Sequence, residues 1–231
     1  MNILVVIPAR GGSKGIPGKN IKLLNGKPLI YYTIDVARTI VSDENICVTT
    51  DDDEIIKVVE SYGLKVPFKR PEYLATDTCG SYEVILHALN YYEKLGYVYD
   101  AIVLLQPTSP FRTPLQVKEA IKLYRTDIDM VVSVKKASSN PYYDCFEEDQ
   151  DGNLIISKGD DSYKRRQDCP LVYEYNGAIY VLNPLSLKRM DFAKFKKKIK
   201  YLMDSVHSID IDNQLDWMLA ECIIKNRMIE L

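Results

Sequence analysis

Short runs of apolar, β-branched residues alternate along the chain with segments whose apolar positions recur at helical spacing. Buried strands are predicted at 3–7, 45–50, 64–68, 100–107 and 129–136. Helices are predicted at 28–40, 51–63, 80–96, 113–125 and 213–228. Alternation of this kind indicates an α/β fold built on an open, mostly parallel (mixed) sheet with helices on both faces.

Residues that start and stop helices support these predictions. Thr113 is a suitable N-cap with Pro114 in the first turn, and Ser81 begins the helix that Gly96 ends. Gly63 suits the end of an earlier helix, whose first turn is acidic.

One region, residues 138–174, interrupts the alternation. It is polar and rich in tyrosine, and Asp151-Gly152 predicts a hairpin between two short β-like runs. We interpret 138–174 as an excursion from an α/β domain formed by 1–137 and 175–231, either a lid or a small β-rich arm that packs on another subunit. Because tyrosine is enriched at interfaces, the composition favours an arm that mediates a homodimer.

Composition narrows the class of protein. With 231 residues, 46% of them hydrophobic, the chain can bury one sizeable core. A net charge of −2 argues against a nucleic-acid binder. Five scattered cysteines without C-x-x-C spacing indicate reduced thiols and a cytoplasmic protein, and His87 and His207 lack the cysteine partners of a zinc site. No apolar run approaches the ~20 residues that span a membrane, and the N-terminus does not have the pattern of a signal peptide.

The loop after the first strand, "ARGGSKGIPGKN" from Ala9 to Asn20, predicts an anion site. Its glycines let backbone N–H groups approach a ligand, and Arg10, Lys14 and Lys19 add positive charge, which suits a phosphate chain. The loop is not a Walker A motif, because Asn20 stands where that motif has Ser or Thr. The dinucleotide-binding fingerprint is not matched either, because no helix follows directly.

A second candidate site is the acidic stretch "SIDIDNQLD". If it is extended, Asp210 and Asp212 share one face and suit Mg²⁺. From the residues alone, a solvated strand end with Asp212 as a helix cap is equally consistent. Asp51 and Asp52 form a competing pair, whose main role we expect to be in the first turn of a helix.

Two further segments carry polar groups near strand or helix ends. "LLQPTSPFR" offers Gln106, Thr108 and Ser109 at the edge of the sheet where the glycine loop lies, although a proline-stiffened turn explains them too. "RPEYLATDTCGS" runs from Arg70 to Ser81, where the first turn of a helix favours an anion or serves only as a cap.

These segments together resemble the acylneuraminate branch of the sugar-activating cytidylyltransferases. "IPARGGSKGIPGKN" is similar to the signature of that family. "TTDDDEI", "KRPEYLATDTCGS", "LLQPTSPFR", "NGAIYV" and "SIDIDNQLD" resemble further family blocks in the expected order across nearly the whole chain. The resemblance implies a Rossmann-like nucleotidyltransferase fold.

The resemblance also implies roles for individual residues. It assigns catalysis to Arg10, Lys19 and Asp210, and a metal ion to Asp210 and Asp212. The nucleotide-binding residues that it implies are Ala9, Gly11, Gly12, Ser13, Asn20, Arg70 and Ser81. The sugar-binding residues that it implies are Gln106, Thr108, Ser109, Arg166, Asn176 and Gly177. Glu174 stands where the family often has an arginine, so the sugar's identity is left open.

The expected reaction is CTP plus an acidic nine-carbon α-keto sugar giving CMP-sugar and pyrophosphate, with Mg²⁺, or Mn²⁺ in its place. The acceptor is left open among neuraminate, legionaminate, pseudaminate and deaminated neuraminate. Alternatives are a transferase acting on ketodeoxyoctulosonate or on an isoprenoid precursor, and a non-catalytic CTP-binding module.

Overall fold

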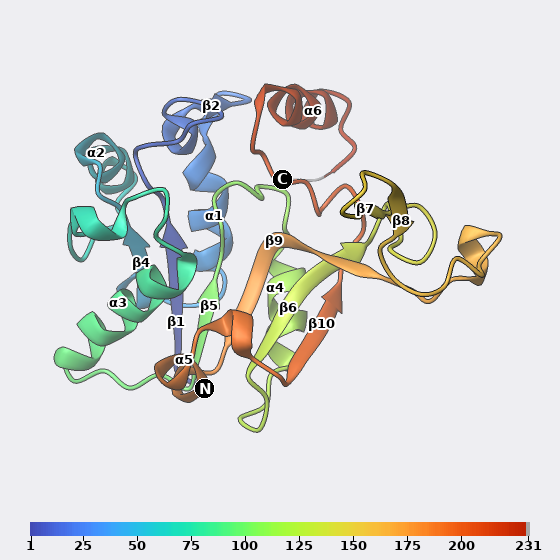
Figure 1. Cartoon of the computed structure of the whole chain (residues 1–231). Coiled ribbons are helices and arrows are strands. Elements are labelled where there is room, and N and C mark those ends of the chain that lie inside the picture. The colour runs from blue at the N-terminus through green and yellow to red at the C-terminus, as the bar shows by residue number, and fades with distance from the viewer. Residues whose placement is uncertain (230–231) are drawn as a thin grey trace.

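The computed structural model describes residues 1–229, and Figure 1 shows their arrangement. The strands are β1 (Ile3–Pro8), β2 (Leu23–Leu24), β3 (Lys27–Pro28), β4 (Ile46–Thr49), β5 (Ala101–Leu104), β6 (Met130–Lys136), β7 (Phe146–Glu148), β8 (Leu154–Ile156), β9 (Tyr173–Leu182) and β10 (Lys198–Leu202). The α-helices are α1 (Leu29–Arg38), α2 (Asp53–Ser61), α3 (Ser81–Lys94), α4 (Pro114–Lys122), α5 (Pro184–Arg189) and α6 (Gln214–Lys225).

A six-stranded mixed sheet organises the molecule, which confirms the predicted sheet type, although β9 and β10 were not among the predicted strands. Its strand order is β10-β6-β9-β5-β1-β4. β1 pairs in parallel with β4 and β5, and β10 pairs in parallel with β6, whereas β9 runs antiparallel to both of its neighbours. The carboxyl ends of β1, β4 and β5 therefore meet at one edge, where ligands bind in open α/β sheets.

Each face of the sheet is covered by helices, because successive strand side chains alternate between two cores. Val5 and Ile7 of β1 pack into one core with residues of α1, α2 and α4. Leu4 and Val6 face the opposite core with residues of α3 and α5. Strands that are apolar on both faces are what a sheet covered on both sides requires.

A third apolar cluster attaches α6 to the carboxyl edge of the sheet. Trp217 of α6 packs there with Ile16 of the glycine loop, Phe111 after β5, and Ile211 just before α6. Trp217 is only 1% exposed and Ile211 is fully buried. This cluster holds the glycine loop and the acidic stretch together, although they lie at opposite ends of the sequence.

The local predictions succeeded at most helix ends. Thr113 caps α4 in a capping box with Pro114 following, and Asp52 caps α2 by accepting from the N–H groups of Glu54 and Ile55. Gly63, after α2, has the positive φ of a helix stop.

Two local predictions were wrong, and two alternative cap assignments were not realised. Residues 64–68 form no strand; Pro67 has no N–H for a ladder, and parallel pairing is confined to a bridge between Lys69 and Thr50. Ser81 does not cap α3, because Gly80 occupies the N-cap and Ser81 is already helical. Asp212 does not cap α6, because Asn213 does so in a capping box. The helix predicted to reach residue 228 ends at Lys225.

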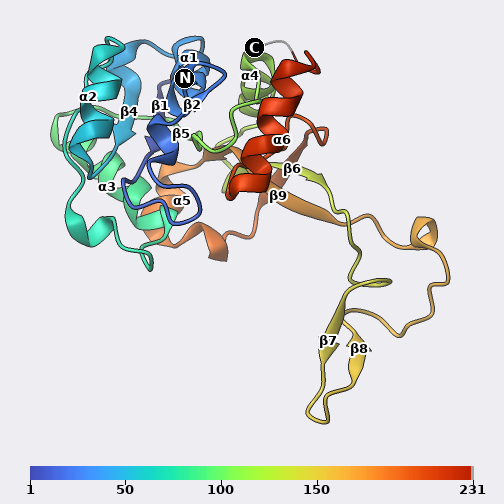
Figure 2. The ribbon, with the colours of Figure 1, turned by 90° about the horizontal axis from the view of Figure 1, so that it is seen from above.

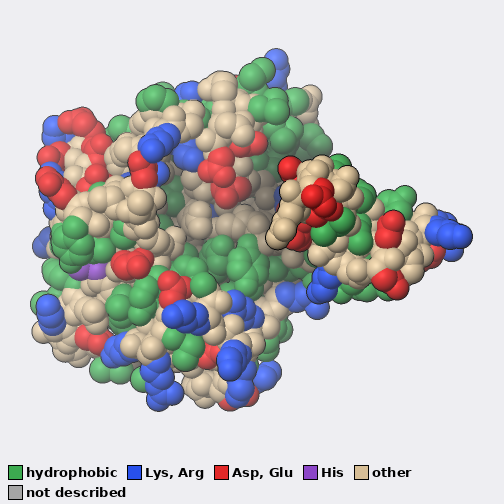
Figure 3. All heavy atoms as spheres, in the orientation of Figure 1, with side chains coloured by type: hydrophobic (Ala, Val, Ile, Leu, Met, Phe, Trp, Pro, Cys, Tyr) green, Lys and Arg blue, Asp and Glu red, His purple; other side chains and the backbone are tan. Residues whose placement is uncertain are grey.

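Residues between β6 and β9 leave the body of the molecule. β7 and β8 pair antiparallel, and Gly152 in their turn has φ +82, so the predicted hairpin is confirmed. Figure 2 shows this arm extending away from the sheet, and in Figure 3 it stands out beside a face that is hollowed near its centre. Within the part of the chain described, none of the helices has the length and apolarity needed to cross a lipid bilayer.

Candidate active site

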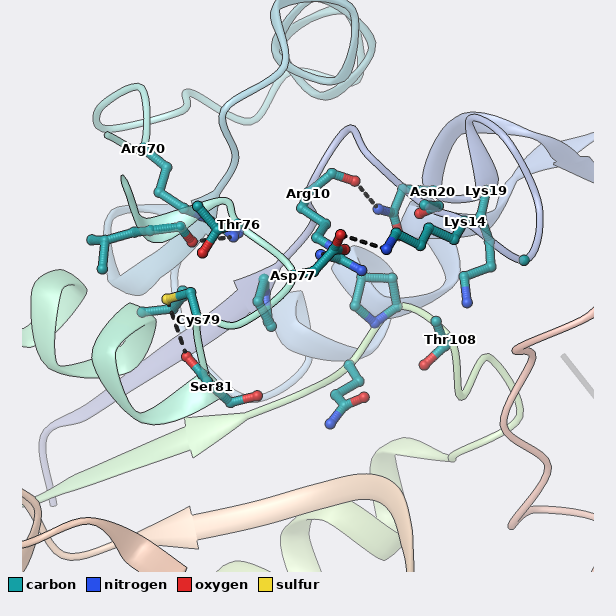
Figure 4. Close-up of a pocket in the computed structure, with 18 of the residues that line it drawn as sticks. Arg10, Lys14, Lys19, Asn20, Arg70, Thr76, Asp77, Cys79, Ser81 and Thr108 are labelled. Carbon is teal, nitrogen blue, oxygen red and sulfur yellow. Dashed lines mark hydrogen bonds and ion pairs between the residues drawn. The ribbon is translucent and has the colours of Figure 1, made fainter. Parts of the chain in front are cut away.

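A cleft of about 380 Å³ lies at the carboxyl edge of the sheet. It is lined by the loop after β1, the segment before α3, and the turn after β5 (Figure 4). The predicted site residues that line it are Arg10, Ser13, Lys19, Asn20, Arg70, Ser81, Gln106, Thr108 and Asp212. Sequence-distant residues therefore converge on one cavity.

Backbone and side-chain bonds hold the glycine loop in place. Asn20 donates from Nδ2 to the carbonyl oxygen of Arg10 at 3.0 Å, which ties the end of the loop to its beginning. The N–H of Gly11 donates to a carboxylate oxygen of Asp51 at 3.2 Å. A Cβ on Gly11 would lie 2.3 Å from a carboxylate oxygen of Asp52, so glycine is needed there for close approach.

Lys19 connects the glycine loop to the acidic stretch. Its ammonium donates to the carbonyl oxygen of Ile211 at 2.6 Å and to a carboxylate oxygen of Asp212 at 3.3 Å. Lys19 is only 9% exposed, whereas the Asp212 side chain is 74% exposed. The cation is thus desolvated and fixed in position, while the carboxylate remains open to the cleft and to solvent.

Asp210 and Asp212 have different surroundings. Asp210 does not line the cleft; a carboxylate oxygen lies so close to Gly177 that a Cβ there would be 2.8 Å away. Its other oxygen, Oδ1, is buried without a hydrogen-bond partner. Burial raises the pKa of Asp210, and a hydrogen bond from Thr108 together with the charges of Lys19 and Arg112 opposes that rise. An orphaned, desolvated carboxylate oxygen of this kind suits a cation.

The turn after β5 is bonded to the acidic stretch that carries Asp210. Arg112 is fully buried, and it donates to the Thr33 hydroxyl at 2.9 Å and to the carbonyl oxygen of Gln106. Burial lowers the pKa of Arg112 to about 9, and the charge of Asp210 acts in the opposite direction. Thr108 accepts the N–H of Ile211 through its carbonyl oxygen at 2.8 Å, which fixes the acidic stretch against this turn.

Arg70 and Ser81 form the wall opposite the glycine loop, together with Cys79 (Figure 4). Arg70 is 4% exposed, and its guanidinium donates to the backbone carbonyl oxygens of Thr49 and Leu74. These bonds fix the orientation of the guanidinium without a ligand. Burial lowers the pKa of Arg70. Ser81 begins α3, whose unpaired N–H groups face the cleft at this end.

Several other predicted site residues do not line the cleft. Ala9 is buried at the end of β1, Ser109 is fully buried, and Asn176 is tied internally to Ser133 and Ser208. Gly11, Gly12 and Gly177 are likewise not among the cleft-lining residues. Arg166 lies in the arm, where it pairs with Asp144.

Sequence reasoning did not assign roles to some residues that line the cleft. Asp77 forms ion pairs with Arg10 at 2.8 Å and with Lys14 at 2.6 Å. Gly15 was expected to let the backbone approach a ligand, and the structure adds a packing role, because an added Cβ would lie 2.0 Å from the carbonyl oxygen of Asp212. Its position in the sequence was the one signal for Asp77. It lies just before the predicted start of a helix, at the edge of the sheet where the cationic loop was also expected.

The two histidines have structural surroundings. His87 packs edge-on against Phe68, with ring centroids 4.8 Å apart, and burial lowers its pKa. His207 lies 2.6 Å from the carboxylate of Asp204 through Nδ1. Cys47, Cys79, Cys145, Cys169 and Cys222 all have free thiols.

Comparison with known structures supports the fold. CMP:2-keto-3-deoxy-manno-octonic acid synthetase, solved in complex with CTP, superposes with a TM-score of 0.70 and covers 98% of this chain and 100% of that one. Because the sequence identity is 17%, this likeness shows the fold alone.

Comparison with known sequences identifies the family. A model of the family described as "Cytidylyltransferase" matches residues 4–226. The chain is 37% identical to CMP-N,N'-diacetyllegionaminic acid synthase of Legionella pneumophila, covering 97% of each. It is 38% identical to N-acylneuraminate cytidylyltransferase of Escherichia coli O18:K1:H7 over 94% of this chain and 51% of that protein. The chain therefore spans about half the length of that relative. The resemblance seen in the glycine loop and the acidic stretch is therefore confirmed, and the chain belongs to the cytidylyltransferase family.

Proposed function

We propose that the chain transfers CMP from CTP to an acidic nine-carbon α-keto sugar of the nonulosonate class and releases pyrophosphate. The observation that carries this proposal is the convergence of Lys19 and Asp212 at one cleft. A triphosphate requires cations and glycine-rich backbone, with a carboxylate nearby for its divalent cation, and the cleft offers these with Lys19 and Asp212 on its lining.

The chemistry is an in-line displacement at the α-phosphorus. The anomeric hydroxyl oxygen forms a bond to phosphorus, the bond from phosphorus to the bridging oxygen breaks, and the hydroxyl proton passes to solvent. Little covalent work falls to the protein, so catalysis depends on positioning and on charge neutralisation. Lys19 and Arg10 neutralise charge that develops on the α-phosphate and on the departing pyrophosphate.

Asp210 and Asp212 would hold a divalent cation, which we propose to be Mg²⁺, with Mn²⁺ able to replace it. The residues present fit such an ion, because one carboxylate has an orphaned buried oxygen and the other opens to the cleft. Within residues 1–229 no group of three or more His, Cys, Asp or Glu residues could hold a metal by itself, so phosphate and water oxygens must complete the shell. When bound, the ion supplies charge stabilisation to the phosphates and lowers the pKa of the attacking hydroxyl.

The remaining wall of the cleft suits the base and the sugar. Ser81 presents the N-terminus of α3, which favours an anion or a carbonyl oxygen. Gln106 and Thr108 offer amide and hydroxyl groups at the junction between the glycine loop and the acidic stretch. We assign the nucleotide to the side formed by the glycine loop, Arg70 and Ser81, and the sugar to the side of Gln106 and Thr108.

The arm is the basis of a proposed homodimer. Phe146, Leu154 and Ile155 on its hairpin are 51%, 71% and 51% exposed. Exposed apolar side chains gathered in one place are typical of a protein–protein interface. The Arg166 side chain is 54% exposed, and it is not among the residues that line the cleft of its own chain. A role for Arg166 in sugar binding therefore requires the cleft of a partner subunit.

A pyrophosphate-release assay tests the function directly. The full chain is supplied with CTP, Mg²⁺ and one acceptor at a time from acylated neuraminate, diacetyllegionaminate, pseudaminate, deaminated neuraminate, ketodeoxyoctulosonate and methylerythritol phosphate. We expect release with a nonulosonate and none with methylerythritol phosphate, and a CMP-sugar of matching mass in the product. Binding of CTP with no release for any acceptor would instead establish a non-catalytic module.

A further inference from the structure

Asp77 occupies the place on the glycine loop where a polyphosphate would be expected. One of its carboxylate oxygens lies 2.8 Å from the guanidinium of Arg10, and the other lies 2.6 Å from the ammonium of Lys14. Figure 4 shows the Asp77 side chain between these two cations inside the cleft. The two ion pairs lower the pKa of Asp77, so the carboxylate is charged at neutral pH.

This contact joins opposite walls of the cleft. Arg10 and Lys14 belong to the loop after β1, whereas Asp77 belongs to the segment between Arg70 and α3, 67 positions from Arg10. The side chains of Asp77 and Lys14 are 49% and 76% exposed, so water reaches the contact. Exposed ion pairs are weak and exchange readily, so this one can open when a stronger anion arrives.

The chemistry of the contact imitates the ligand. A carboxylate that offers two oxygens to one arginine and one lysine reproduces part of what a phosphate group offers. A triphosphate or pyrophosphate brings several negative charges to the same cations, and it would be repelled by a carboxylate that stayed there. Asp77 and a bound polyphosphate therefore cannot both pair with Arg10 and Lys14.

We propose that Asp77 is an internal competitor for the polyphosphate site, which is displaced when the triphosphate of CTP binds and pairs again with Arg10 and Lys14 as pyrophosphate leaves. This proposal rests on the proposed function and names a further residue of the same site. Its consequence is that the enzyme binds pyrophosphate less tightly than its cations alone would allow, and so releases its product sooner.

A merely structural role for Asp77 predicts the opposite change in pyrophosphate affinity when Asp77 is removed. If Asp77 only held Arg10 and Lys14 in a productive orientation, its removal would loosen both cations and weaken polyphosphate binding. Competition predicts that removal strengthens binding, because the cations become available and a like charge is lost. The sign of the change in affinity therefore distinguishes the two roles.

The test is the affinity of the full chain for inorganic pyrophosphate, measured by titration calorimetry without divalent metal. We expect Asp77→Asn and Asp77→Ala to bind pyrophosphate about fivefold or more tightly than wild type, as removal of one like charge at contact distance implies. Asp127→Asn is the matched control: it removes one exposed carboxylate that pairs with Arg125, and it should bind like wild type. Unchanged or weaker binding in both Asp77 variants overturns the proposal.

Turnover supplies a second readout. In the wild type, pyrophosphate should inhibit the forward reaction less strongly than in Asp77→Asn, whose inhibition constant should fall by the same factor as its dissociation constant. If the wild type releases no pyrophosphate with any acceptor, the proposed function fails. If the wild type turns over and Asp77→Asn is inhibited equally, only the role of Asp77 fails.

Discussion

The ammonium of Lys19 lies 2.6 Å from the backbone carbonyl oxygen of Ile211, so a residue near the start of the chain is bonded to one near its end. Ile211 is fully buried in the apolar cluster around Trp217, and its N–H donates to the carbonyl oxygen of Thr108 at 2.8 Å. A lysine anchored in this way presents its charge at a defined place, which is what preorganised electrostatic catalysis requires.

Replacing Lys19 should separate catalysis from folding. Lys19→Ala removes a preorganised cation, and we expect kcat to fall by ~10²-fold or more. It also leaves the carbonyl oxygen of Ile211 without its donor, which should cost about 1–3 kcal/mol of stability. Initial rates and thermal denaturation measure the two effects, with Lys57→Ala as the control because Lys57 lies on the outer surface of α2. A normal kcat would remove Lys19 from the mechanism.

The two carboxylates should respond differently to substitution. Asp212→Asn should raise the Mg²⁺ concentration needed for half-maximal activity, because the exposed carboxylate contributes directly to the cation site. Asp210→Asn should do so as well, and it should also raise the melting temperature because it removes a buried charge whose ionised form is disfavoured by desolvation. Metal titrations that coincide with wild type for both variants would refute the assignment.

Gly15 and Gly12 provide a contrast within one loop. A Cβ at Gly15 would meet the carbonyl oxygen of Asp212 at 2.0 Å, whereas a Cβ at Gly12 would meet nothing within 4 Å. Gly15→Ala should therefore push the two loops apart and destabilise the free protein by about 1–3 kcal/mol, while Gly12→Ala leaves its stability unchanged. Denaturation of both variants without ligand tests this. Equal stabilities would mean that the loops adjust without cost.

Arg166 should act across the proposed dimer. A mixture of inactive Lys19→Ala and inactive Arg166→Ala chains forms heterodimers in which one cleft has an intact lysine and receives an intact arm from the other chain. Full exchange should restore about a quarter of wild-type activity, because half of the dimers are mixed and each has one complete site. No recovery would show that Arg166 does not act in the cleft of a partner subunit, and a monomer in sedimentation would overturn the dimer itself.

Asp129 should make the free energy of unfolding depend on pH in the acidic range. Its pKa is lowered first by a hydrogen bond from Ser186 and then by the N–H of Lys197, so its stabilising effect is complete above the unfolded pKa of about 3.9 and is lost as pH falls through the lower folded value. Asp129→Asn should be less stable than wild type at pH 7, and it should differ from wild type by a smaller margin at a pH below the unfolded pKa of about 3.9. Urea denaturation at both values checks this, and a constant difference would show that charge is not involved.

The main strands and most helix ends could be predicted from the sequence, because the local sequence patterns there favour the same structure as the burial of those residues requires. β1 and β5 are apolar on both faces, and both lie inside a covered sheet. The Thr113 cap and the Asp151-Gly152 turn depend on short-range geometry and were found without tertiary information. The antiparallel direction of β9 could not be predicted, because direction depends on which neighbours a strand finds.

The site was predictable in outline only. Glycines and cations at a strand end predicted a ligand-binding loop, and that loop lines the cleft, yet the pairing of Arg10 with Asp77 depends on how an irregular segment crosses the cleft. Asp210 and Asp212 were expected on one face. In the structure only Asp212 lines the cleft, because residues 209–212 are irregular rather than a regular strand and Asp210 turns toward Gly177.

The cluster around Trp217 has a consequence for synthesis. Residues from the first and last portions of the chain must pack together before Lys19 meets Ile211, so the reaction centre cannot exist on a nascent polypeptide that still holds α6 within the ribosome. A ribosome-bound intermediate could fold β1 to β5, but it would be inactive until residues 209–225 had emerged from the ribosome. The enzyme therefore cannot consume nucleotide prematurely, and a fragment ending before residue 209 should be inert however well its sheet forms.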